Sequence, residues 1–147
     1  MKIKTITICS SGSFYKEVLE ITRQLRKLDY RVLIPSTATK MQKSGNFDID
    51  TYKTWYKNPK DYRNKRNLMD GHFKKVIKSD AILVVNNEKH GIKGYIGGNG
   101  LMEITLAYHY KKPIFILNEI SENLPFKEEI LGVNPIFLNG RIEKLTD

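Results

Sequence analysis

The sequence predicts an α/β protein, a three-layer sandwich around a central, mainly parallel sheet of about five strands. Short apolar runs rich in β-branched residues recur along the 147 residues, as at Ala81–Val85 and Ile114–Leu117. Segments with helical spacing separate these runs. Strands that alternate with helices are joined by right-handed crossovers, which make the sheet parallel and place helices on both of its faces.

The N-terminal half begins with a strand and an amphipathic helix. Ile3–Cys9 is rich in β-branched residues, which suits a buried strand, and Arg31–Pro35 has the composition of a second one. Between them, apolar residues at steps of three and four predict one face of a helix: Phe14, Val18, Ile21, Leu25 and Leu28. Ser36–Arg66 then breaks the regular pattern. A connection of this length is usually a lid or a binding loop, or contains helix that the pattern does not show.

The C-terminal half continues the alternation, with a glycine-rich loop after the third strand. We expect a helix at Asn67–Lys78, strands at Ala81–Val85, Ile114–Leu117 and Pro135–Leu138, a helix at Leu101–Tyr110 with Leu101, Ile104 and Tyr108 inward, and a short helix within Ser121–Leu131. This succession predicts a single domain over residues 1–147, with a sheet of the flavodoxin or Rossmann type.

The composition is that of an ordinary globular protein, with 40% hydrophobic and 28% charged residues. The longest apolar runs are too short to span a bilayer, so we expect no membrane association. Lysine and threonine interrupt the apolar residues near the N-terminus, which therefore lacks the core of a signal peptide. The single cysteine, Cys9, excludes an internal disulfide. These features predict a cytoplasmic protein.

The net charge of +9 is concentrated between Lys53 and Lys78, where nine Lys or Arg residues stand against two Asp residues. Such a cluster attracts phosphate, on a nucleotide or on a nucleic acid, or forms only a solvated basic surface. No nucleic-acid-binding motif accompanies the charge, so we do not expect a nucleic acid as partner. Aromatic residues in the same region, Trp55 and Tyr56 among them, either pack on the body of the protein or cover a bound base.

Two loops have the character of ligand-binding segments. Backbone N–H groups at a helix N-terminus favour anions, and glycine lets a ligand approach the main chain. Ligands of open α/β sheets also bind at the carboxyl ends of the strands. On these grounds the candidate substrate-binding residues are Ser11, Gly12, Ser13 and Phe14 after the first strand, Asn86 and Asn87 at the end of the third, and Gly97, Gly98, Asn99 and Gly100 in the glycine-rich loop.

Glu103 is the candidate for chemistry, because it follows the glycine-rich loop at the start of a helix. The alternative is a glutamate that only complements the helix dipole from the first turn. The histidines, His72, His90 and His109, are scattered, and the lone cysteine is expected to be buried. We therefore expect no metal site and no cofactor.

Three stretches of the chain carry a family resemblance: the strand and small-residue turn at Ile6–Phe14, the segment Ser79–Val85, and Gly98–Tyr108 followed by Lys112-Pro113-Ile114. Taken together they resemble the nucleoside 2-deoxyribosyltransferase family and its relatives that hydrolyse nucleoside 5′-monophosphates. The third is similar to the family's Gly-x-x-x-Glu-x-(Gly/Ala)-x-Ala pattern. The resemblance implies that Glu103 is the nucleophile of an N-glycosidic bond enzyme, and that the protein is a homodimer or a larger homo-oligomer.

The chain departs from the family pattern at three places, one of which is the loop before Glu103, where the expected acidic residue is missing unless Glu88 serves. Thr7 stands where transferases have a tyrosine, and His72 stands in place of a catalytic aspartate, eight residues ahead of Asp80. A histidine can donate a proton to a leaving base near neutral pH. We therefore assign Glu103, His72 and Asp80 to catalysis on a nucleoside or nucleotide. The alternative is a nucleotide- or nucleotide-sugar-binding module without catalysis.

Overall fold

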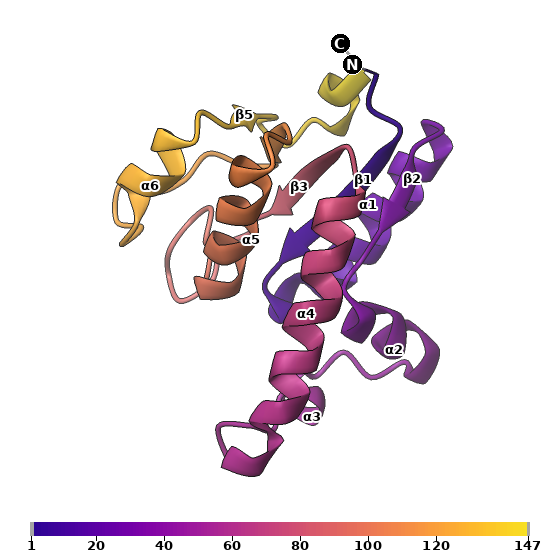
Figure 1. Ribbon diagram of the computed structural model, residues 1–147, viewed down its shortest axis with the longest axis vertical. Helices are drawn as coiled ribbons and strands as arrows, with labels where there is room; N and C mark the ends of the chain where they lie inside the picture. The colour runs from indigo at the N-terminus through magenta and orange to yellow at the C-terminus, as the bar shows by residue number, and fades with distance from the viewer. Residues whose placement is uncertain (1, 147) are drawn as a thin grey trace.

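The computed structural model describes residues 2–146, which contain a five-stranded parallel sheet with helices on both faces (Figure 1). The strands are β1 (Thr5–Ser10), β2 (Arg31–Leu33), β3 (Ala81–Val85), β4 (Ile114–Ile116) and β5 (Ile136–Phe137). Their order is β2-β1-β3-β4-β5, and every neighbouring pair is parallel. The predicted fold class is confirmed. Strand order reverses between β1 and β3, the point at which open α/β sheets bind ligands.

The helices form one layer on each face of this sheet. They are α1 (Tyr15–Lys27), α2 (Ser36–Ser44), α3 (Ile49–Tyr52), α4 (Tyr62–Lys78), α5 (Gly98–His109) and α6 (Lys127–Gly132), with 3-10 turns at Gly12–Phe14, Pro59–Asp61 and Ile142–Thr146. Buried residues of α1 and of the last 3-10 turn form one core with the sheet. Buried residues of α4, α5 and α6 form the other core on the opposite face.

Side chains along β1 alternate between the two faces of the sheet, and this alternation decides which of them face α4 and α5. Ile6 and Ile8 point into the core beneath α1, whereas Cys9 belongs to the core beneath α4 and α5. Thr7 shares the face of Cys9, and its Oγ1 donates a hydrogen bond to the Lys75 carbonyl of α4 at 3.0 Å. Because Cys9 is the second-last residue of β1, its thiol lies near the carboxyl edge of the sheet.

The long connection Ser36–Arg66 contains helix that the sequence pattern did not show. It holds α2 and α3, and α4 begins at Tyr62 rather than at Asn67. In α2 only Thr37, Ala38 and Met41 are buried, which leaves too few apolar residues for a clear periodicity. The lower part of α4, with α3 beside it, projects from the body of the protein (Figure 1).

Helix α5 differs from the prediction in both start and orientation. It begins at Gly98, so Glu103 lies in its second turn, and no acidic residue lies in the first. Its buried residues are Gly100, Glu103, Ile104 and Ala107, while Tyr108 is 57% exposed rather than inward. A carboxylate and two small residues occupy the buried face, so an apolar stripe could not reveal it.

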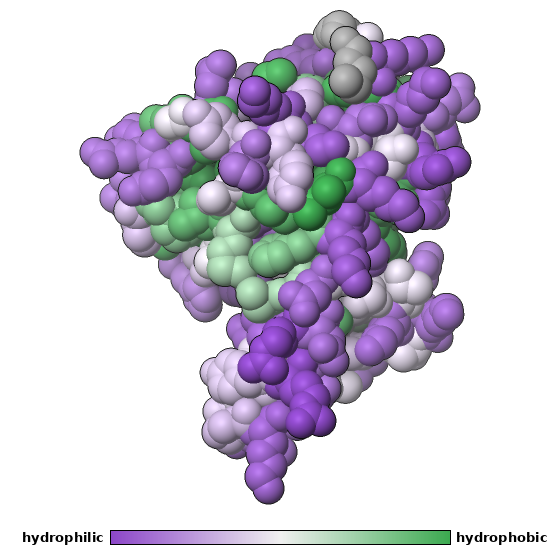
Figure 2. Space-filling model, in the orientation of Figure 1, coloured by the Kyte–Doolittle hydropathy of each residue, from purple (hydrophilic) through white to green (hydrophobic). Residues whose placement is uncertain are grey.

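The remaining differences concern the end of the chain and the surface. Helix α6 covers Lys127–Gly132, whereas the sequence predicted helix over Ser121–Leu131, and it begins two residues after Pro125. No helix among residues 2–146 is long and apolar enough to cross a bilayer. Figure 2 shows hydrophilic side chains over the projecting part and hydrophobic ones gathered between α4 and α5.

Candidate functional site

A cleft of about 630 Å³ opens at the carboxyl end of β1, between the β1–α1 turn, the N-terminus of α5 and one side of α4. The structure brings together in it most of the residues predicted from the two loops. The predicted residues that line it are Ser11, Gly12, Ser13, His72, Gly97, Gly98, Asn99, Gly100 and Glu103. Volumes of this size are typical of small-molecule sites.

Three of the predicted binding residues have structural positions instead. Phe14 is 5% exposed and packs in the core beneath α1. Asn86 is fully buried, and its side chain accepts a hydrogen bond from the Asn118 N–H at 2.9 Å and donates one to the Asn118 carbonyl at 2.8 Å. Asn87 is outside the cleft lining, and its carbonyl accepts from the Tyr95 N–H. Asn86 also donates to the Gly94 carbonyl at 3.3 Å, so both asparagines bind the backbone of the glycine-rich loop.

Asp80 lies at the opposite edge of the sheet from the cleft. It precedes β3, whose first residue pairs with Ile6 in parallel register, so it stands at the amino ends of the strands. Its Oδ2 accepts the N–H groups of Lys4 and Thr5, both at 2.9 Å, and these bonds lower the pKa of the carboxyl. The structure corrects the catalytic assignment of Asp80, which joins β3 to the start of β1.

Glu103 is the buried carboxylate of the cleft, with an exposed fraction of 8%. Burial raises the pKa of its carboxyl to about 7, and interactions with the Cys9 thiol and the Lys65 charge oppose that rise. Burial removes the hydration that stabilises the charged carboxylate, and this explains why the pKa rises. At neutral pH the carboxyl is therefore close to half protonated.

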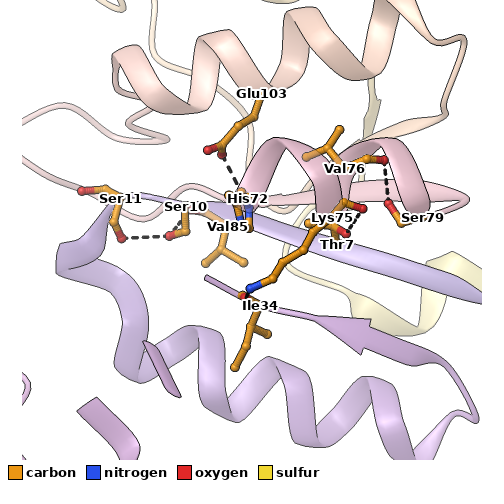
Figure 3. A network of polar contacts seen from close by, with 10 residues as sticks. All are labelled: Thr7, Ser10, Ser11, Ile34, His72, Lys75, Val76, Ser79, Val85 and Glu103. Atoms are coloured by element: carbon orange, nitrogen blue, oxygen red, sulfur yellow. Dashed lines mark hydrogen bonds and ion pairs between the residues drawn. The ribbon is translucent and has the colours of Figure 1, made fainter. Parts of the chain in front are cut away.

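His72 projects from α4 toward Glu103 (Figure 3). Its Nε2 lies 3.9 Å from Glu103 Oε1, and neither ring nitrogen has a hydrogen-bond partner of good geometry among the described residues. Burial, followed by the charge of Lys75, lowers the pKa of the imidazole to about 4, against the influence of the Ile8 carbonyl. His72 is therefore neutral near pH 7 and is not a ready proton donor.

Cys9 completes a buried group of three side chains. Its Sγ, a nitrogen of His72 and a carboxylate oxygen of Glu103 all lie within 4.8 Å of one another. Burial and the Glu103 charge raise the pKa of the Cys9 thiol well above its usual range. The sequence pattern predicted no cluster of metal-ligating residues, but the fold assembles one from β1, α4 and α5.

Four lysines line the cleft: Lys53, Lys65 and Lys75 from the predicted basic cluster, and Lys89, which sequence reasoning missed. Lys89 Nζ donates to Ser11 Oγ at 2.9 Å and lies 5.5 Å from the centroid of the Tyr95 ring. Lys65 Nζ lies 5.3 Å from the centroid of the Trp55 ring. The basic composition of Lys53–Lys78 pointed to phosphate, but nothing in the sequence indicated which lysines would face the cleft.

Tyr15 was also missed, because it reads as the first residue of an amphipathic helix. Its side chain lines the cleft, and burial followed by the Glu103 charge raises the pKa of its phenol. The phenol is thus protonated over the working range of pH. The site offers a buried carboxylate, an un-ionised phenol and a neutral imidazole, with lysines at the rim.

The chain matches no known protein-family model, and it has no significant match among curated proteins.

Proposed function

We propose that this chain is an N-glycosidic bond enzyme that acts on a nucleoside or a nucleoside 5′-monophosphate, with Glu103 as nucleophile. The observation that carries the proposal is a carboxylate 8% exposed on α5, in a cleft shared with the amides that begin that helix. A buried carboxylate beside anion-binding amides suits a sugar whose reacting carbon becomes cationic.

The cleft has complementary surfaces for the parts of a nucleotide. The N–H groups at the start of α5, together with Ser11 and the ammonium of Lys89, suit a phosphate or the sugar hydroxyls. Tyr56, which is 49% exposed, offers an aromatic face for a base, whereas Trp55 is 9% exposed and packs in the cleft wall with Lys65 over its ring. The lysines favour a phosphorylated substrate over a neutral one.

The reaction has two steps. The Glu103 carboxylate attacks the anomeric carbon, the C–N bond breaks with its electron pair moving to the base, and the base takes up a proton. The Tyr15 phenol is the un-ionised donor that faces the cleft with Glu103. Water or a second base then attacks the anomeric carbon, the bond to Glu103 breaks with its electron pair returning to the carboxylate, and the proton of the attacking group goes to Tyr15, which lost its own in the first step. His72, neutral and buried, shapes the site for the carboxylate.

A second candidate function is nucleotide binding without turnover. The pKa of about 7 at Glu103 favours it, because the unliganded carboxyl is half protonated at neutral pH and a protonated carboxyl is no nucleophile. This function predicts thermal stabilisation by nucleotides, as for any ligand of the folded state, without release of base.

Incubation with a panel of nucleosides and 5′-monophosphates, followed by detection of free base, tests the enzyme. We expect base release by the wild type and a loss of roughly 10²–10⁴-fold in Glu103→Gln, the usual range for a positioned catalytic group. Glu128→Gln, on the exposed side of α6, is the matched control and should keep full activity. Nucleotide-induced stabilisation without base release from any compound would favour the binding module instead.

A further inference from the structure

We propose that Cys9, His72 and Glu103 form a binding site for a thiophilic divalent cation such as Zn²⁺. This inference goes beyond the proposed function, because it assigns a second ligand to Glu103 and a ligand to Cys9 and His72, which bind none in the proposed reaction. Glu103 cannot serve a cation and a sugar at once. A bound cation therefore inhibits cleavage of the N-glycosidic bond.

The geometry of the three donors is close to that of a metal site. All three donor atoms lie within 4.8 Å of one another, and His72 Nε2 lies 3.9 Å from Glu103 Oε1. Around a tetrahedral Zn²⁺, with bonds of about 2.0–2.3 Å, donor atoms stand roughly 3.3–3.6 Å apart. Small side-chain rotations close that difference. One thiol, one imidazole and one carboxylate are all donors that Zn²⁺ accepts.

The state of His72 is the independent observation that points to a ligand. Its side chain is 8% exposed, yet neither ring nitrogen has a hydrogen-bond partner of good geometry among the described residues. A buried polar group without a hydrogen-bond partner lowers the stability of the folded state, and native structures rarely contain one that has no role. The Ile8 carbonyl beside the ring is the kind of group to which metal-bound histidines donate their second N–H.

Charge balance favours a divalent cation despite the surrounding lysines. Binding of the cation displaces the proton of the Cys9 thiol to solvent, and the resulting thiolate and the Glu103 carboxylate carry two negative charges, which together neutralise one divalent ion. The ammonium of Lys75 donates to the Ile34 carbonyl at 2.7 Å, and that of Lys65 lies over the Trp55 ring. A sulfur ligand selects Zn²⁺ or Co²⁺ over Mg²⁺. His72 and Glu103 both line the cleft, which gives a cation a way to reach the three donors.

Titration of the metal-free protein with Co²⁺ and Zn²⁺, without any nucleoside, tests the site. We expect one Co²⁺ per chain, with a near-ultraviolet absorption band from the cobalt–thiolate bond, and a rise in thermal midpoint with Zn²⁺ but not with Mg²⁺. Cys9→Ser should lose the band, and His72→Asn should weaken binding at least about 10-fold. His109→Asn, at the far end of α5, is the control and should bind like the wild type.

Cys9→Ser and His72→Asn are both made because either substitution alone could prevent folding. Circular dichroism shows which of the two variants is folded, and the metal titration is read from that one. Absence of the cobalt–thiolate band in the wild type, or binding undiminished in both variants, overturns the proposal. Base release is measured separately with a chelator present. If the protein releases base but binds no metal, only the metal site is contradicted. If it binds metal but releases no base, only the proposed enzymatic activity is contradicted.

Discussion

His72 Nε2 lies 3.9 Å from Glu103 Oε1, too far for a hydrogen bond, and the two side chains are 8% and 10% exposed. Burial is therefore the main influence on the protonation of both groups, and it favours the neutral form of each. Burial lowers the pKa of the imidazole to about 4 and raises that of the carboxyl to about 7. The two shifts have opposite consequences for stability.

The first prediction concerns the pH dependence of the free energy of unfolding. The unfolded chain protonates His72 below about pH 6.5, so its contribution to stability is lost as pH falls from 6.5 to 4. The folded chain holds the Glu103 proton up to about pH 7, so that contribution is lost as pH rises from 4.5 to 7. Each amounts to roughly 3–4 kcal/mol at most. Between pH 4.5 and 6.5 the two contributions of the wild type cancel.

Single variants should separate these two contributions. In Glu103→Gln the stability should rise from pH 4 to 6.5, and in His72→Asn it should fall from pH 4.5 to 7. Urea unfolding at several pH values, with a chelator present, measures both slopes. Variants that keep the wild-type profile would show that the pair does not titrate as its burial requires.

The second prediction uses Gly98 as a steric probe of the cleft. A Cβ built at Gly98 meets no atom within 4 Å, yet the residue lines the cleft. Gly98→Ala should therefore keep or slightly raise stability, since alanine favours a helix by up to about 1 kcal/mol, while nucleotide binding weakens. Gly132→Ala in α6 is the control, because its Cβ also meets nothing and it lies outside the cleft. If Gly98→Ala binds nucleotide as tightly as Gly132→Ala does, the ligand does not lie against Gly98.

The third prediction separates Asp80 from catalysis. Asp80→Ala removes the acceptor of the Lys4 and Thr5 N–H groups and should cost about 1 kcal/mol of stability, with the rate of base release unchanged. Asp70→Ala, on the exposed side of α4, should change neither quantity. Thermal unfolding measures the stability of both variants, and base-release assays measure their activity. A slower reaction in Asp80→Ala alone would support the catalytic assignment of Asp80.

Local patterns in the sequence were enough to predict the layers of this protein and to place Glu103 in a helix after the glycine-rich loop. Runs such as Ala81–Val85 carry their strand preference in β-branched residues, and α1 shows its buried face through regular spacing. The glycine-rich loop before a helix likewise marks an anion-favouring junction without reference to the rest of the chain. These signals depend only on neighbours a few residues apart.

Tertiary structure alone decided which residues meet. The parallel register of β1 and β3 places Asp80 at one edge of the sheet and Cys9 near the other, although both adjoin strands of similar composition. The orientation of α5 was decided by close packing around Gly100 and Ala107, which turns Glu103 inward to His72 and Cys9. Periodicity reveals that a helix has a buried face, but strand order and packing select the face and its partners, because those contacts join residues far apart in the chain.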